Sequence, residues 1–204
     1  MNTGKAEIVP VQKEGSKSDN EHTIVCKNRE EAIQLFASAS DRLLNVNKWE
    51  SYCNGLLTAD FKLCDPAGNE VERLAQERDY FKIDIPGPGP VDGDGYDWVQ
   101  IERINSVKEA AGDTEMISMQ VRPASSPKNA KDSVAHFFSD EATSTFLVER
   151  KENKVNAAIH GRNEKPNTDT SVVDKVRNNM VANAAMIRFS DIQWKQLAVG
   201  LLLA

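Results

Sequence analysis

Acid–base and metal-binding side chains are concentrated in the stretch 124–144, ASSPKNAKDSVAHFFSDEATS. There His136 is followed by Asp140 and Glu141, and an imidazole beside carboxylates is a frequent catalytic pairing. The three histidines of the chain lack the HxH or HExxH spacing of zinc sites. Ser139 lacks the small-residue elbow that exposes a hydrolase nucleophile. The pattern therefore favours a loop with ordinary polar residues over a catalytic centre.

A second candidate is the loop 86–95, PGPGPVDGDG, whose glycines suggest a phosphate cradle and whose aspartates suggest a calcium site. The loop lacks the lysine and the following helix that make a P-loop an anion site. Asp92, Asp94 and Asp97 could crowd oxygen ligands around a hard cation, but their spacing is not that of an EF-hand. We expect a rigid connection at the rim of a sheet, with no metal and no cofactor.

Alternation of apolar and polar residues on both sides of this loop predicts the strands that hold it. Phe81, Ile83 and Ile85 alternate with polar residues before the loop, and Val99 and Ile101 do so after it. The stretch 79–104 is therefore expected to be a hairpin with a long loop and one buried face.

Before the hairpin, the pattern predicts a short strand and two helices. The strand covers 23–26. Asn28 with Glu31 is a capping-box start for a helix that carries one apolar stripe. Asn47 with Glu50 repeats the capping pattern and predicts a second, short helix.

The remaining elements are further strands and a terminal helix. Strands are predicted at 57–64, 116–122, 145–150 and 154–162, with a polar connection at 106–113. His160 and Arg162 fall on the face opposite the apolar residues of their strand and are expected to look toward solvent. From Ser171 onward, apolar residues at helical spacing predict a helix of about four turns. Ser190 begins another capping pattern, so we expect a break near Phe189.

Together these elements predict an α+β fold. It consists of a curved antiparallel sheet of six to seven strands wrapped around a long C-terminal helix, with two short helices after the first strand. Residues 1–20 have little to bury and are expected to be a disordered tail, because ordering them would cost backbone entropy. Residues 21–204 are expected to form a single domain.

This order of elements resembles the helix-grip superfamily, which includes START-like lipid-transfer domains, plant pollen-allergen-like proteins and polyketide-cyclase-like proteins. The resemblance covers residues 21–190 and rests on the order of elements, so no functional residue is carried over. It implies a space between the sheet and the last helix that can hold an apolar ligand. A cone-shaped fold of the nuclear-transport-factor-like kind is the rival, but that fold ends on strands.

The expected binding site is the apolar lining between the sheet and the terminal helix. Its inward positions are almost free of ionisable groups, which suits a hydrophobic small molecule or lipid. The same residues would also make a solid core, because a core and a cavity wall differ only in whether the volume is filled. The predicted ligand-lining residues are Phe81, Ile83, Val99, Ile101, Met119, Ile159, Met180 and Ala184.

Two other functions stay open. A small cyclase-like or hydrolase-like enzyme could use the same pocket, with Asp97 and Arg103 as polar groups among apolar neighbours and a buried carboxylate as the general base. A structural or interaction protein would have a solid core and use Tyr80, Tyr96 and Trp98, which stand on the outer sheet face if the aliphatic residues point inward; interfaces are rich in such side chains. Strand 96–104 has apolar residues on both faces, so Trp98 as a core residue is an equal alternative. A homodimer is compatible with these functions.

Composition restricts the class of partner. The 204 residues carry a formal net charge of -6, so the broad positive field of nucleic-acid-binding proteins is absent. No apolar run approaches the roughly 20 residues that cross a bilayer. No apolar stretch of a secretory signal follows the first lysine, so a cytoplasmic protein is expected. Cys26, Cys53 and Cys64 lack CxxC spacing and are predicted to be buried thiols rather than ligands or disulfides.

Overall fold

The computed structural model describes residues 8–52, 59–85, 91–109, 113–129, 133–167 and 180–204, with the backbone alone for Val91 and for 180–190. The strands are β1 (Ser16–Val25), β2 (Asp60–Cys64), β3 (Tyr80–Asp84), β4 (Asp97–Lys108), β5 (Thr114–Pro123), β6 (Thr143–Lys151) and β7 (Lys154–Glu164). The helices are α2 (Arg29–Leu44), α3 (Trp49–Tyr52) and α5 (Met180–Leu203), with short 3-10 turns η1 (Val46–Lys48) and η2 (Val91–Gly93).

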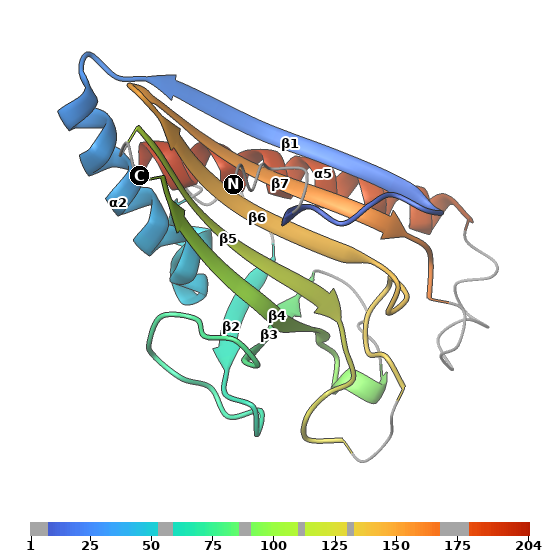
Figure 1. The fold of residues 1–204 in the computed structure, drawn as a ribbon. Helices are drawn as coiled ribbons and strands as arrows, with labels where there is room; N and C mark the ends of the chain where they lie inside the picture. Colours follow the sequence, from blue (N-terminus) through green and yellow to red (C-terminus); the bar gives the residue numbers. More distant parts are fainter. Residues whose placement is uncertain (1–7, 53–58, 86–90, 110–112, 130–132, 168–179) are drawn as a thin grey trace.

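The strands form one curved antiparallel sheet in the order β1-β7-β6-β5-β4-β3-β2. Consecutive strands are neighbours except β1, which pairs with β7 and lies at the sheet edge. Helix α5 runs along β1 and β7, and its C-terminal end meets α2 (Figure 1). The α+β class, the antiparallel sheet, the helices after the first strand and the C-terminal helix are as the sequence predicts. No helix in the described ranges combines the length and the apolar character that a membrane span requires.

Helix α2 begins where the capping pattern predicts. The Asn28 Oδ1 atom accepts the Glu31 N–H at 2.8 Å, and Glu31 Oε2 accepts the Lys27 N–H at 2.8 Å. The first bond satisfies a donor that the first helical turn cannot pair internally, and the second ties the residue before the cap to that turn. At the other end, the Arg42 guanidinium donates to the Leu201 carbonyl at 2.9 Å and joins α2 to α5.

Asn28→Ala is expected to lower the free energy of unfolding by about 1 kcal/mol, because α2 loses its N-cap acceptor. Asn45, which follows the last residue of α2, makes no side-chain cap bond. Asn45→Ala is therefore the matched control and should cost less than about 0.5 kcal/mol. Urea unfolding measures both variants, and equal losses would rule out the cap bond as the cause.

The N-terminal strand is longer than predicted. β1 begins at Ser16 instead of residue 23, and its register with β7 places Ser16 opposite Glu164 and Asp19 opposite His160. The assignment of 16–20 to a disordered tail is therefore wrong. Backbone hydrogen bonds to the distant strand β7 order these residues, although their own side chains have little to bury. Before β1, Ile8 packs against Met116, Leu147 and Ala158 on the outer sheet face.

Other elements also begin or end at different residues than predicted, because contacts with distant parts of the chain override the local pattern. β4 continues to Lys108 through the predicted polar connection, because β5 pairs with it along that length. Asn47 caps no helix; its Oδ1 accepts the Leu63 N–H at 2.7 Å and its amide donates to the Val71 carbonyl at 2.8 Å. Helix α5 continues through Ser190 without the predicted break. A capping residue acts only where the helix leaves backbone N–H groups unpaired, and here it does not.

Aromatic rings fill the centre of the core. Trp49 is fully buried, with its ring centroid 4.8 Å from Phe146, 5.3 Å from Phe61 and 5.5 Å from Phe81. Its indole N–H points to the Arg42 and Leu43 carbonyls at the end of α2, both at 3.2 Å. The helix layer and the sheet are therefore joined by packed rings rather than separated by an open space.

Candidate ligand pocket

A pocket lies on the inner face of the sheet, at the end where β3, β5 and β7 finish and β4 and β6 begin. We call this the wide-end pocket. Its apolar wall includes Phe61, Phe81, Ile83, Ile85, Val99 and Phe146, and its polar wall consists of His136, Ser144, Glu164 and Gln193. The open volume of the pocket is about 40 Å³, which is room for about three water molecules. Trp194 limits this volume, because it lines the pocket with its ring centroid 5.2 Å from that of Phe146 and 6.1 Å from that of Phe61.

Residues 135–139, which we call the strap, cross this end of the sheet. The Phe137 N–H donates to Asp97 Oδ1 at the start of β4, and the Ser139 N–H donates to the Lys165 carbonyl just after β7, both at 2.9 Å. Phe138 forms a β-bridge with Pro166. The strap therefore contributes His136, Phe137 and Phe138 to the lining of the pocket.

Burial sets the charge state of the groups at the strap. It lowers the pKa of His136 to about 3, so the ring is neutral at physiological pH. The His136 Nδ1 atom accepts the Phe138 N–H at 2.9 Å, which places the ring proton on Nε2. Burial also raises the pKa of Asp97 to about 7, against the opposing effect of the Phe137 hydrogen bond. A buried carboxyl of this kind costs stability when it ionises.

The predicted ligand-lining residues divide into three groups. Phe81, Ile83 and Val99 line the wide-end pocket. Ile101, Met119 and Ile159 are fully buried in the core. The side chains of Met180 and Ala184 lie outside the described part of the structure. The ligand-binding role of the whole set stays a prediction.

The side chains that the sequence offers for acid–base or metal chemistry do not lie together. His136 is buried, whereas Asp140 and Glu141 are exposed, and Glu141 Oε2 lies 2.8 Å from the Lys165 ammonium. In the loop before β4, Asp92 accepts the Ser133 hydroxyl at 2.8 Å. Over the ranges that the structure describes, no three His, Cys, Asp or Glu side chains form a group able to hold a metal ion. Cys26 and Cys64 are buried free thiols, and Cys53 lies outside the described residues.

Asp97 and Arg103 do not form the polar pair that the enzyme hypothesis needs. Asp97 is 5% exposed, but it binds the strap backbone. Arg103 is exposed, because a bulge between Ile101 and Arg103 shifts the register of β4 against β5 and breaks the alternation. The sequence predicts that these two side chains point to the same face of the strand, and the bulge removes this relation.

The predicted aromatic surface on the outer face is covered. Trp98 is 3% exposed, and its indole N–H donates to the Gly93 carbonyl at 3.1 Å. Ala135 is buried against it, and Tyr80 and Tyr96 are half-buried beside it. The connection between β5 and β6 covers this part of the sheet, so Trp98 cannot anchor a partner.

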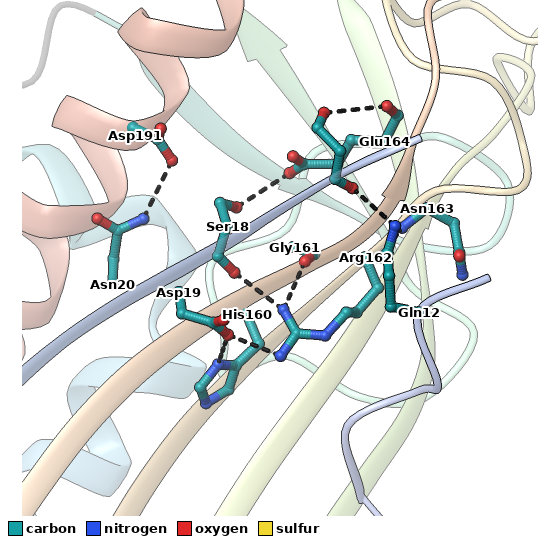
Figure 2. A network of polar contacts seen from close by, with 11 residues as sticks. Gln12, Ser18, Asp19, Asn20, His160, Gly161, Arg162, Asn163, Glu164 and Asp191 are labelled. Atoms are coloured by element: carbon teal, nitrogen blue, oxygen red, sulfur yellow. Dashed lines mark hydrogen bonds and ion pairs between the residues drawn. The ribbon is translucent and has the colours of Figure 1, made fainter. Parts of the chain in front are cut away.

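Figure 2 shows a polar network around the paired ends of β1 and β7. His160 Nδ1 lies 2.6 Å from Asp19 Oδ1, and Arg162 donates to the same oxygen at 2.7 Å. Burial by itself raises the pKa of Asp19, but the hydrogen bonds from His160 and Arg162 outweigh it and bring the pKa below its usual value. His160 and Arg162 share the outer face as predicted, yet His160 is 6% exposed rather than open to solvent.

Glu164 is a pocket residue that the sequence pattern missed. Strict alternation would place it on the outer face with His160 and Arg162. Asn163 adopts a left-handed backbone, with φ 56°, and this reverses the alternation so that Asn163 faces outward and Glu164 lines the pocket. An asparagine at the end of a strand was the available signal, because asparagine tolerates this conformation better than most residues.

Three comparisons with known proteins were made on the sequence and on the structure. No family model matches the sequence. No curated protein matches it. Similar solved structures include a Bacillus halodurans protein determined in solution, with 10% identity, TM-score 0.42, and 91% of this chain and 96% of that chain covered. Ara h 8.0201 has 12% identity and TM-score 0.34, covering 90% of this chain and 99% of that chain.

Norcoclaurine synthase from Thalictrum flavum, solved in complex with dopamine and hydroxybenzaldehyde, has 8% identity and TM-score 0.34, covering 91% of this chain and 93% of that chain. Likenesses at these TM-scores carry no argument. The fold is described from the molecule itself, in which a curved antiparallel sheet packs against the C-terminal helix along β1 and β7.

Proposed function

We propose that the chain binds a small, mainly apolar molecule in the wide-end pocket. The observation that carries this proposal is the pocket wall, which is apolar along β2 to β6 and polar at few positions. Such a wall is typical of sites that hold a ligand by burial and orient it by a few polar contacts. Phe137 and Trp194 line the pocket and are half-buried, so a ligand larger than the open volume enters by turning these rings outward.

Ala142→Phe is expected to weaken binding of phenylbutanol by about tenfold or more, because the new ring occupies volume that the ligand needs. Ala142 lines the pocket and is 2% exposed. Ala37 lies on the exposed face of α2, so Ala37→Phe adds the same ring elsewhere and is the matched control. Amide NMR shifts during titration of the full chain measure the affinity.

Two outcomes of this titration are decisive. Loss of binding in Ala142→Phe, with Ala37→Phe unchanged and both proteins folded by thermal unfolding, supports the wide-end pocket as the site. Undiminished binding by folded Ala142→Phe would contradict the proposal. Native mass spectrometry of the purified chain checks in addition for a molecule that co-purifies with it.

A further inference from the structure

Glu164 has a carboxyl group that the fold holds in a defined place on the pocket wall. Ser18 on β1 donates its hydroxyl to Glu164 Oε1 at 3.1 Å. Gly161 leaves the space for this carboxyl, because a Cβ atom there would lie 2.0 Å from Glu164 Oε1 and 2.4 Å from Ser18 Oγ. The left-handed backbone of Asn163 turns Glu164 inward, so three local features position one buried carboxyl.

No cation in the described part of the chain forms an ion pair with Glu164. Arg162 is engaged on the other side of β1, where its guanidinium donates to Asp19 at 2.7 Å and to the Ser18 and Gly161 carbonyls at 3.0 and 2.7 Å. Lys165 pairs with Glu14 and Glu141 outside the pocket. The neighbouring positive charges are therefore committed elsewhere.

A second carboxyl adds negative charge near Glu164. Asp191 on α5 accepts the Asn20 side-chain amide at 3.3 Å, and Figure 2 shows this pair on the same side of β1 as the Glu164 carboxyl. Burial has the largest effect on the pKa of Glu164 and raises it. The Ser18 hydrogen bond opposes this increase, whereas the charge of Asp191 adds to it, and the pKa stays above its usual value. A desolvated carboxylate without a counter-ion is costly, so this end of the pocket favours a bound cation.

The end of the pocket opposite Glu164 is lined by apolar side chains. Sheet order places β7, with Glu164, at one side of the pocket and β3 and β2 at the other. That other side is lined by Phe61, Phe81, Ile83 and Ile85. The wall therefore changes from acidic to apolar across the sheet.

We propose that the ligand of the wide-end pocket is an amphipathic amine, with its ammonium group on the Glu164 carboxylate and its apolar body extending toward β3. This inference rests on the proposed function and specifies its ligand class. The ammonium group supplies the missing counter-ion, whereas a neutral alcohol supplies one hydrogen bond and no charge. A carboxylate of the same shape is repelled by Glu164 and Asp191.

The test compares phenylbutylamine, phenylbutanol and phenylbutyrate, which share one apolar body, on the full chain by amide NMR titration. Wild type is expected to bind the amine about tenfold or more tightly than the alcohol, and the carboxylate most weakly. Glu164→Gln keeps the shape and the Ser18 acceptor but removes the charge, and should bring the amine to the affinity of the alcohol. Glu141→Gln removes a carboxylate outside the pocket and should leave all affinities unchanged.

The outcomes separate this inference from the proposed function. The amine assignment is overturned if wild type binds amine and alcohol equally, or if folded Glu164→Gln binds the amine as wild type does. In either case the pocket is still supported if wild type binds the alcohol and Ala142→Phe abolishes that binding. Absence of binding by all three compounds overturns both. Selective loss of the amine preference in Glu164→Gln supports the inference.

Discussion

Trp49→Ala is expected to lower the free energy of unfolding by about 3–5 kcal/mol, the range measured for removing a buried aromatic side chain from a core. Trp49 is fully buried and its ring contacts Phe61, Phe81 and Phe146. These rings come from β2, β3 and β6, so one substitution opens a cavity among three strands. It also leaves the carbonyls of Arg42 and Leu43 without the indole donor.

Urea unfolding followed by circular dichroism measures this loss. Leu74 is a large apolar residue that is 41% exposed, and Leu74→Ala should cost less than about 0.5 kcal/mol. Trp49→Phe keeps one ring in the site and should cost less than Trp49→Ala. A loss below about 1 kcal/mol in Trp49→Ala would show that the aromatic core is not packed as described.

Asp97→Asn is expected to stabilise the protein above pH 7 and to have little effect near pH 4. Burial raises the pKa of Asp97 from the ordinary 3.8 to about 7. Between these two values the folded state holds a proton that the unfolded state has released, so rising pH lowers the stability of wild type. Above pH 7 both states are ionised and the full penalty, up to about 4 kcal/mol, is present.

The asparagine variant lacks this penalty because its side chain is neutral at every pH, and its amide oxygen can still accept the Phe137 N–H. Unfolding free energies at several pH values give the difference between the variant and wild type, which cancels all other titrating groups. That difference should grow as pH rises from 4 to 7 and then level off. Asp94 is exposed, so Asp94→Asn should show no such trend. A difference for Asp97→Asn that is the same at every pH would contradict a raised pKa.

Local patterns account for most of the secondary structure. The strands of the hairpin 79–104 follow from strict alternation around Phe81 and Val99, since a strand with one buried face must repeat every two residues. The start of α2 follows from Asn28 and Glu31, because the donors of a first helical turn need nearby acceptors. The order of these elements then predicts the α+β class and the position of the terminal helix. All of these signals act over a few residues.

The pocket and its polar end were decided by contacts between distant segments. Alternation marks Trp98 as outward, but the connection after β5 covers it. Alternation marks Glu164 as outward too, but one left-handed residue, Asn163, turns it to the inner face.

Whether the apolar lining encloses a cavity depends on how closely the helices approach the sheet and on which rings fill the gap. Trp49 and Trp194 both pack against the Phe146 ring in this gap. A one-dimensional pattern states which face is apolar, whereas the filled volume is set by the summed shapes of side chains that only the tertiary structure brings together.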